Sequence, residues 1–454
     1  MTRVSAVGLA VPQLLLLPLL SLLPLLSGCT SDNGADSPDA SPPDAVELPE
    51  PKPADKVESS EECRTACVKQ INASTPRALW VSIDDGKAVW NQCEGERTDC
   101  YGGTGTTIHV HRFSVGGAEE TVSTLSTENK FGSASNDNGK AAWVGRDKAD
   151  GDLEVFLYDG KTTINVTNNK THESQAYFHG NLVVWTGCEE SADECSGKKT
   201  IRKYDIAAGT TEIISASAAD SFAPATDGNL VAWIQSEPSG GCSIYTWTAS
   251  QPAAKVSKVD CSGWIPWGAD LTVKVADGKL VWIDCAGPTS ECYSGGNGFD
   301  IFHYDGTDIT KLKPNKYAID DPQFSDGYAV WWGCDGADCL ADPPQGDTEI
   351  YVWNGSKVGN ITSNFDSDVR ARTARREVVW TAGFGDTSEV FYWTGSRAFK
   401  LTEDSLTDAW PEIDENKRYA IWRTNDAFVK LADISCMEDC LDGKSHSFGQ
   451  ASGQ

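Results

Sequence analysis

Acidic side chains recur where the innermost strand of each repeated unit is expected to begin, and they are the most suggestive candidates for chemistry in this chain. Carboxylates gathered on one face would bind a cation such as calcium, or a basic partner, and neighbouring like charges would raise some of their pKa values. The alternative is that each carboxylate accepts hydrogen bonds from backbone amides of its own turn, as Asp commonly does. The candidate binding residues are Glu173, Asp220, Asp320, Asp368 and Asp408.

Other patterns that carry chemistry are weak. The sequence has no Gly-x-Ser-x-Gly, no Cys-x-x-Cys and no glycine loop for phosphate, and its six histidines are scattered. His109 and His111 alternate along an expected strand, which fits a polar surface better than a metal pair. Segment 147–154 lacks the ligand spacing of an EF-hand, so a solvated turn is expected there. We predict no catalytic residue, no metal ligands and no cofactor, calcium at the carboxylates being the exception considered.

The overall charge narrows the classes of partner. The 454 residues contain 38 Lys and Arg against 66 Asp and Glu, a net charge of −28. Such an excess of negative charge repels phosphate backbones and anionic lipid surfaces. Nucleic acid is therefore excluded as a partner. We expect a monomer that binds a protein or a glycan.

A short phrase that ends in Trp repeats along the chain and indicates the elements that position these side chains. Each copy has a turn, then small or branched residues, then Trp, as in Asp227 to Trp233 and Asp326 to Trp331. The spacings between successive Trp residues are 53, 42, 48, 49, 49, 49 and 42. We expect these residues to fill the gaps between repeated units. The repeat Trp residues are Trp90, Trp143, Trp185, Trp233, Trp282, Trp331, Trp380 and Trp422.

Each unit reads as four antiparallel strands. Segments such as 154–159 and 349–353 alternate with period two and indicate strands with one buried face. A short outer strand follows a turn, as in 163–167 and 358–362. Four strands in a repeat of 42 to 53 residues are typical of a β-propeller blade. We predict an all-β, eight-bladed propeller, with seven blades as the alternative because the first and last copies are the weakest.

The repeat resembles the TolB-like β-propeller repeat of bacterial envelope proteins. The resemblance is carried by Pro322 to Gly327, then Val330 and Trp331, then Glu349 to Val352, and it covers about residues 68–435. It implies a fold much more than an activity. Three further Trp residues lie outside the repeat position and are candidates for stacking on sugars or partners, or for filling the core: Trp264, Trp267 and Trp410.

The last unit lacks a fourth strand, and the start of the domain supplies a matching one. Val68 to Ser74 reads like the outer strands elsewhere, so we expect it to complete the eighth blade and to close the ring. Closure would bring the first and last cysteines together, which favours the disulfides Cys63 with Cys440 and Cys67 with Cys436. The alternatives are local bridges over three residues, or a metal site.

The other cysteines fall into local pairs, as expected of an exported protein with an even number of them. Four pairs follow a repeat Trp and would staple the loop beyond it. The fifth lies within the fourth unit. The predicted pairs are Cys93 with Cys100, Cys188 with Cys195, Cys285 with Cys292, Cys334 with Cys339, and Cys242 with Cys261.

The first 28 residues have the features of a targeting signal. Arg3, an apolar run and the ending Leu26-Ser27-Gly28-Cys29 predict a lipoprotein signal peptide in which Cys29 is lipidated, an uncleaved membrane anchor being the alternative. Residues 29–62 are rich in Pro and acidic residues and are expected to form a disordered tether. The propeller would span 63–440, and 441–454 would be a disordered tail.

These features predict a non-catalytic lipoprotein of the bacterial envelope, with the outer membrane favoured and the lipid anchor as its only membrane contact. Its propeller would present a rigid face to another envelope protein. The alternative is a propeller that binds or cleaves a glycan, because paired carboxylates on one face could serve a glycosidase.

Overall fold

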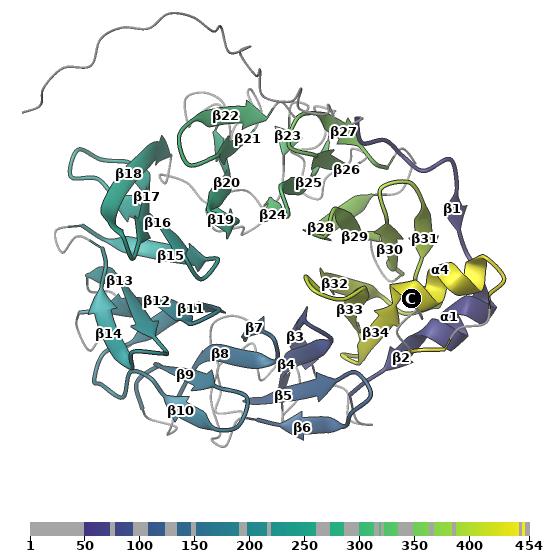
Figure 1. Ribbon diagram of the computed structural model, residues 1–454, viewed down its shortest axis with the longest axis horizontal. Helices are drawn as coiled ribbons and strands as arrows, with labels where there is room; N and C mark the ends of the chain where they lie inside the picture. The colour runs from purple at the N-terminus through teal and green to yellow at the C-terminus, as the bar shows by residue number, and fades with distance from the viewer. Residues whose placement is uncertain are drawn as a thin grey trace, which may run out of the picture. The chain divides into compact units, whose positions relative to one another are not determined.

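Eight sheets are arranged in a ring in the computed structural model (Figure 1). The structure describes residues 50–72, 78–93, 108–122, 134–146, 151–189, 198–215, 219–259, 273–285, 299–312, 317–318, 322–334, 348–362, 367–383, 387–444 and 447–449. Each sheet is one blade with antiparallel strands in the order of the sequence, counted from the centre outward, except where the ring closes and where blades 6 and 7 each gain one further short strand. The predicted eight-bladed propeller is therefore confirmed, and the seven-bladed alternative is wrong.

The inner two strands of each blade flank a tight turn, which we call the inner turn. The innermost strands of blades 1 to 8 are β3 (Ala78–Asp84), β7 (Ser135–Asp137), β11 (Glu173–His179), β15 (Ser221–Thr226), β19 (Val273–Ala276), β24 (Gln323–Ser325), β28 (Asp368–Ala374) and β32 (Asp408–Ile413). The second strands, which carry the repeat Trp residues, are β4 (Lys87–Cys93), β8 (Lys140–Gly145), β12 (Leu182–Cys188), β16 (Leu230–Ser236), β20 (Lys279–Cys285), β25 (Tyr328–Cys334), β29 (Glu377–Ala382) and β33 (Tyr419–Thr424).

The outer two strands complete each blade. The third strands are β5 (Ile108–Ser114), β9 (Glu154–Tyr158), β13 (Lys199–Asp205), β17 (Cys242–Thr248), β21 (Phe299–Tyr304), β26 (Thr348–Trp353), β30 (Glu389–Trp393) and β34 (Val429–Asp433). The fourth strands of blades 1 to 7 are β6 (Glu119–Thr121), β10 (Thr163–Asn165), β14 (Thr210–Ile213), β18 (Gln251–Val259), β22 (Ile309–Leu312), β27 (Val358–Asn360) and β31 (Ala398–Lys400). In blade 6, β23 (Tyr317–Ala318) also pairs with β25.

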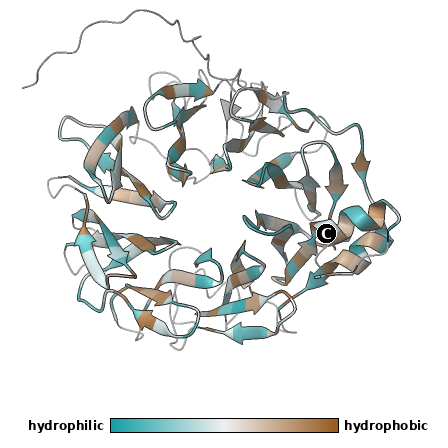
Figure 2. Cartoon of the chain, viewed as in Figure 1, coloured by the Kyte–Doolittle hydropathy of each residue, from teal (hydrophilic) through white to brown (hydrophobic). Residues whose placement is uncertain are grey.

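The core lies between neighbouring blades. Trp90 of blade 1 shares a cluster with Ile421 of blade 8, and Trp331 of blade 6 shares one with Ile283 of blade 5. All eight repeat Trp side chains are buried, as predicted. In most blades the Trp stacks on a Phe or Tyr of the third strand, and in blade 1 His111 takes this place with ring centroids 5.7 Å apart. Figure 2 shows hydrophobic residues in brown on strands all round the ring.

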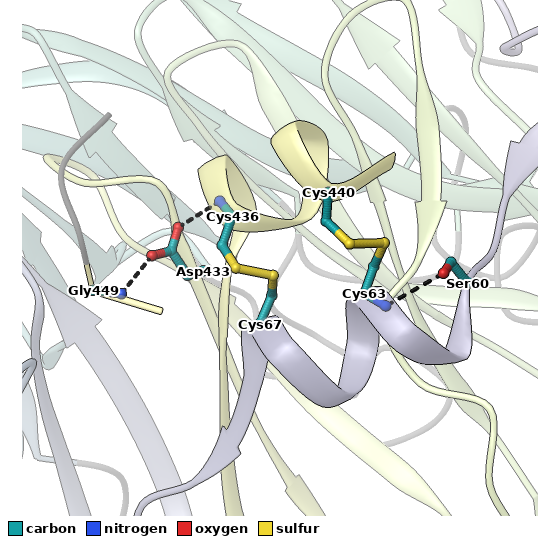
Figure 3. The surroundings of a disulfide bond; sticks show 7 residues. All are labelled: Ser60, Cys63, Cys67, Asp433, Cys436, Cys440 and Gly449. Atoms are coloured by element: carbon teal, nitrogen blue, oxygen red, sulfur yellow. Dashed lines mark hydrogen bonds between the residues drawn. A yellow bond between two sulfur atoms is a disulfide. The ribbon is translucent and has the colours of Figure 1, made fainter. Parts of the chain in front are cut away.

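The ring closes through the start of the domain. β2 (Val68–Gln70) pairs antiparallel with β34 and supplies the fourth strand of blade 8, as predicted. Two short helices flank this seam: α1 (Glu61–Cys67) precedes β2, and α4 (Ile434–Leu441) follows β34. The helices are joined by the disulfides Cys63–Cys440 and Cys67–Cys436, the pairing that the closure argument favoured (Figure 3).

The remaining cysteines are described in part. Cys93, Cys188, Cys242 and Cys334 are disulfide-bonded. Their predicted partners Cys100, Cys195, Cys261 and Cys339 lie outside the described residues, as do Cys292 and the side chain of Cys285. Residues 1–49, with the predicted signal peptide and Cys29, also lie outside them. Within the described part of the chain, no helix has the length and apolar character needed to cross a bilayer.

Parts of two segments expected to be disordered contact the propeller. β1 (Val57–Glu58) pairs in parallel with β31, and the Glu58 carboxylate accepts hydrogen bonds from Arg397 at 2.8 and 3.1 Å. At the other end, Phe448 packs against Tyr419, and the backbone N–H of Gly449 donates to Asp433 at 2.9 Å. Glu58, Phe448 and Gly449 therefore contact the blades, although composition alone predicted disorder in both segments.

Candidate functional site

Three of the candidate carboxylates are buried beneath the repeat Trp residues. The indole Nε1 donates a hydrogen bond to the carboxylate at the start of the same blade: Trp185 to Glu173 at 3.0 Å, Trp380 to Asp368 at 2.7 Å and Trp422 to Asp408 at 2.9 Å. Each of these carboxylates is at most 1% exposed. They hold the indole rings in place from within the blades.

Strand register explains this pairing. Asp368 lies opposite Ala382, two residues beyond Trp380, so the acid and the indole share one face of the sheet. A β-bulge follows each acid, and its residue has positive φ: 52° at Gln175, 56° at Arg370 and 56° at Trp410. The bulge bends the innermost strand.

Burial changes the acidity of two of these groups. Burial raises the pKa of Glu173 to about 7 against hydrogen bonds from Asn169 and Trp185 and the charge of Arg202, whose Nη1 lies 3.6 Å from the carboxylate. Burial also raises the pKa of Asp408 to about 7, opposed mainly by Lys430, whose Nζ is 3.9 Å away. Both carboxyl groups therefore hold a proton more readily than a solvated acid.

The five predicted binding residues do not form a ring open to solvent. Asp220 is exposed and accepts a hydrogen bond from the backbone N–H of Lys199 at 3.1 Å, while Asp320 lies outside the described residues. The other three are buried and accept hydrogen bonds from indoles. This arrangement is neither a cation-binding ring nor bonding to the amides of their own turns, the two arrangements expected from the sequence. No cluster of three His, Cys, Asp or Glu within the described residues has an arrangement suited to a metal ion.

A second set of carboxylates lies at the inner turns and joins neighbouring blades. Asp84 accepts from the backbone N–H of Asn138 at 2.6 Å, and Asp227 from that of Gly278 at 2.7 Å. The same arrangement links Asp326 to the N–H of Arg375 at 2.6 Å. Asp137 with Gly180, and Asp414 with Gly86, follow the same pattern. These bonds join the inner turns of neighbouring blades at five of the eight blade junctions.

A cavity of about 650 Å³ opens among these turns. Its walls come from blades 3, 4, 5, 6 and 8, so it spans the mouth of the central channel, and we call it the channel mouth. Its charged lining includes four carboxylates and one histidine and contains no Trp, Tyr or Phe among the described residues. These charged residues are His179, Asp227, Asp277, Asp326 and Glu415.

Two of the four carboxylates have no hydrogen-bonding partner in the part of the chain that the structure describes. Asp277 and Glu415 are exposed, and neither makes a hydrogen bond or ion pair with another described residue. Although water reaches Glu415, the surrounding protein raises its pKa by desolvation, and Asp84, Asp326 and Asp137 add to the rise while His179 opposes it. A positive group entering the channel mouth would relieve this repulsion.

Sequence reasoning missed the channel mouth. The inner turns were read only as turns, although Asp227, Asp277 and Asp326 occupy the same place in three successive repeats. That regularity was the available signal. Glu415 gave none, because the inner turn of blade 8 is longer and breaks the pattern.

Of the three additional Trp residues, only Trp410 lies within the described part of the chain. Its side chain is 38% exposed, and the guanidinium of Arg370 lies 3.8 Å from the ring centroid. It is therefore not a core residue. Trp264 and Trp267 lie outside the described residues.

Comparison with known proteins finds solved propeller structures that resemble this chain, but it assigns the chain to no family. No family model matches the chain, and no curated protein does. The β-propeller domain of the Trilobed protease from Pyrococcus furiosus is 11% identical, with a TM-score of 0.47, covering 73% of this chain and 97% of that domain.

Two other solved structures have a similarly low sequence identity to this chain. The acylaminoacyl peptidase of Pyrococcus horikoshii is 11% identical with a TM-score of 0.48, and the match covers 77% of this chain but only 57% of the peptidase. TolB from Acinetobacter baumannii is 12% identical with a TM-score of 0.34, covering 76% of this chain and 79% of that one. The chain thus spans little more than half of the peptidase that it resembles.

Proposed function

We propose that this chain is a non-catalytic lipoprotein of a bacterial envelope whose propeller binds a cationic segment of a protein partner at the channel mouth. The observation that carries the proposal concerns Asp277 and Glu415, two exposed carboxylates that have no partner among the described residues and line a cavity of about 650 Å³. A Lys or Arg side chain from a partner would complete both groups. The net charge of −28 would also speed the approach of a basic partner.

The scaffold suits binding without chemistry. Two disulfides close the ring, and hydrogen bonds between inner turns join neighbouring blades, so the channel mouth is built on fixed elements. The described lining of the cavity offers no aromatic side chain beside the carboxylates, and a glycosidase would use one to hold a sugar across the two acids. We therefore favour protein binding over glycan cleavage at this site.

The anchor belongs to the same proposal. Cys29 would carry the lipid, and the TolB-like character of the repeat supports an envelope address, with the outer membrane favoured. Intact mass of the protein purified from a bacterial host would show the diacylglyceryl group, and Cys29→Ser would abolish it and release the protein from membranes. An unmodified wild-type Cys29 would overturn this part.

A defined basic probe tests the binding site. Titration calorimetry with a hexalysine peptide should show binding that weakens as salt rises. The double variant Asp277→Asn, Glu415→Gln should weaken it by about tenfold or more, since two charge-assisted contacts are lost. The control pair Glu62→Gln, Asp308→Asn removes the same charge elsewhere and should leave the affinity unchanged. Equal effects of both pairs would show that only net charge matters.

Photo-crosslinking in cells then identifies the partner. A photoreactive residue at 415 should capture one envelope protein through a Lys- or Arg-rich segment, and the same group at Asp205 should not. Capture of the same species from both positions, or of polysaccharide alone from position 415, would contradict the proposal.

A further inference from the structure

The inner turn of blade 5 carries two opposite charges that are not paired with each other. Asp277 and Lys279 flank Gly278 at this turn, and neither makes a hydrogen bond or an ion pair with another residue in the described ranges. Asp277 lies on the wall of the channel mouth, while Lys279 lies on the wall of a second cavity, between blades 5 and 6. The turn therefore separates an acidic cavity from one that contains an unpaired cation.

The corresponding turn of blade 1 shows how such charges are satisfied elsewhere in the ring. Asp85, Gly86 and Lys87 repeat the sequence Asp-Gly-Lys, and the first two residues have closely similar positive φ in both turns. In blade 1 the Lys87 ammonium lies 2.9 Å from the Asp85 carboxylate and also contacts the side-chain oxygen of Asn138. The same turn in blade 5 leaves both charges available to a partner.

The second cavity, which we call the interblade pocket, lies beside the channel mouth. Its volume is about 440 Å³, and ligand sites usually measure about 300–1,000 Å³. Among the described residues it shares only Asp326 with the channel mouth. One wall is closed by His303 of β21, which is 5% exposed and whose ring centroid lies 4.5 Å from that of Trp353 and 5.6 Å from that of Phe324. Because His303 Nε2 is inaccessible, a ligand would meet the charged rim of the pocket instead.

Two cations on this rim have unused hydrogen-bond donors. Arg376, at the inner turn of blade 7, is exposed, and its Cζ lies 5.8 Å from the ring centroid of Tyr328. It makes no hydrogen bond or ion pair within the described part of the chain. Burial lowers the pKa of His303 and the charge of Lys279 adds to this effect, so the Lys279 ammonium acts on the wall of the pocket. An ammonium and a guanidinium with free N–H groups suit a carboxylate, which accepts from both.

The two carboxylates of the pocket already have hydrogen-bond donors of their own. Asp305 accepts from the backbone N–H groups of Asp308 and Thr307, both at 2.8 Å, and these bonds lower its pKa to about 2. Asp326 accepts from the backbone N–H of Arg375 at 2.6 Å. Neither acid is ion-paired with the two cations, so an incoming carboxylate would displace neither of them.

The charge of the whole molecule decides how an acidic group could arrive. A net charge of −28 repels a free anion as it approaches. An acidic group attached to a basic segment would be carried to the pocket, because the channel mouth next to it attracts the basic part. Building on the function proposed above, we propose that the partner's segment is bipolar: a basic residue enters the channel mouth, and a neighbouring acidic residue binds to Lys279 and Arg376 in the interblade pocket.

Titration calorimetry with lengthened peptides tests this proposal. Hexalysine is extended by Gly-Gly-Glu-Glu or by Gly-Gly-Gln-Gln, at the N-terminus in one pair of peptides and at the C-terminus in the other. If only net charge mattered, the Glu residues would weaken binding to so acidic a protein. We expect instead that at least one Glu peptide binds about threefold or more tightly than its Gln counterpart, because its carboxylates pair with two partly exposed cations.

Removing the two cations should abolish this preference. In the double variant Lys279→Gln, Arg376→Gln, the Glu peptide should bind no more tightly than the Gln peptide, while hexalysine should keep at least its wild-type affinity. The control pair Lys161→Gln, Lys170→Gln removes the same charge from exposed residues on either side of β10 and should keep the preference. Because neither pair of side chains holds a described partner, both variants should melt at the wild-type temperature, so a lost preference would not reflect unfolding.

The outcomes separate the bipolar segment from the function on which it builds. If hexalysine does not bind the wild-type protein, the function proposed for the channel mouth fails, and the bipolar segment fails with it. If hexalysine binds but neither Glu peptide exceeds its Gln counterpart, the bipolar segment alone is wrong. It is also wrong if the preference survives in Lys279→Gln, Arg376→Gln or disappears equally in the control pair.

Discussion

The carboxylate of Asp414 accepts a hydrogen bond from the backbone N–H of Gly86 at 2.6 Å, across 328 residues of sequence. The same carboxylate accepts from Asp85 at 3.1 Å and from two amides of its own turn, Asn416 and Lys417. It is fully buried. The ring is therefore closed in two ways: this carboxylate joins the inner turns of blades 8 and 1, and the disulfides join the two helices that flank the closing strand within blade 8.

Asp414→Asn should lower the free energy of unfolding by about 2–3 kcal/mol, because an amide group would turn an N–H toward a backbone donor in a site closed to water. Asp227 makes the equivalent contact with Gly278 but is only half-buried, so Asp227→Asn should cost less than about 1 kcal/mol. Urea denaturation of both variants measures the difference. Equal losses would show that the inner seal of blades 8 and 1 has no special weight.

The two disulfides should act redundantly. They close loops of nearly the same length, with sequence separations of 377 and 369 residues, so one bridge alone restrains most of the unfolded chain. Replacing Cys63 and Cys440 by Ser should cost about 1 kcal/mol, whereas replacing all four cysteines should cost about 4 kcal/mol or more. Denaturation of three variants checks this: one with Cys63 and Cys440 replaced, one with Cys67 and Cys436 replaced, and one with all four replaced. Strictly additive losses would contradict it.

Stability should depend on pH through Glu173. The pKa of this carboxyl is about 7 in the folded protein against an ordinary value of 4.5. Between these values the folded state keeps a proton that the unfolded chain releases, so the free energy of unfolding falls as the pH rises through this window, by at most about 3 kcal/mol.

Glu173→Gln removes this dependence. The variant should therefore gain stability relative to the wild type as the pH rises from below 4.5 to above 7. Urea denaturation of both proteins on either side of the window measures the change. A difference between the two proteins that stays constant with pH would refute the assignment.

The segment before α1 depends on Gly359. A Cβ atom at this residue of β27 would overlap the backbone carbonyl of Pro51. Gly359→Ala should displace the segment and speed tryptic cleavage at Lys56, with a change in the free energy of unfolding of less than about 0.5 kcal/mol. Cleavage at Lys444 serves as the internal control. Unchanged cleavage at Lys56 would show that the segment is held elsewhere.

The fold could be predicted where residues repeat, and the sites could not where neighbours come from different blades. The repeat Trp and the outer-strand pattern of Val68 to Ser74 are local, so blade number and ring closure followed from them. The bond from Trp380 to Asp368 depends on strand register and a bulge, which spacing alone does not show. The aromatic rings that pack against His303 belong to the next blade. Phe324 lies 21 residues further along the chain and Trp353 lies 50 residues further.

Charge patterning misled in a similar way. The acids at the start of the innermost strands were chosen because they recur, but recurrence here reflects a shared packing role beneath the indoles. Glu415 does not recur, and its setting arises only when the inner turns of other blades converge around it. Similarly, Val57 and Glu58 lie in a polar, Pro-rich stretch, and only the free edge of β31 orders them.

The paired bridges between α1 and α4 also determine how the molecule responds to a pulling force. Tension applied through residues before Glu50 first loads the two-residue pairing of β1 with β31, which is short enough to peel away. Beyond it the load reaches Cys63 and crosses directly to α4, so β2 is not pulled out of blade 8. The closing strand β2 therefore carries no load, although without the disulfides it would be the first strand to separate from its sheet. The pairing of β1 with β31 breaks before the ring opens.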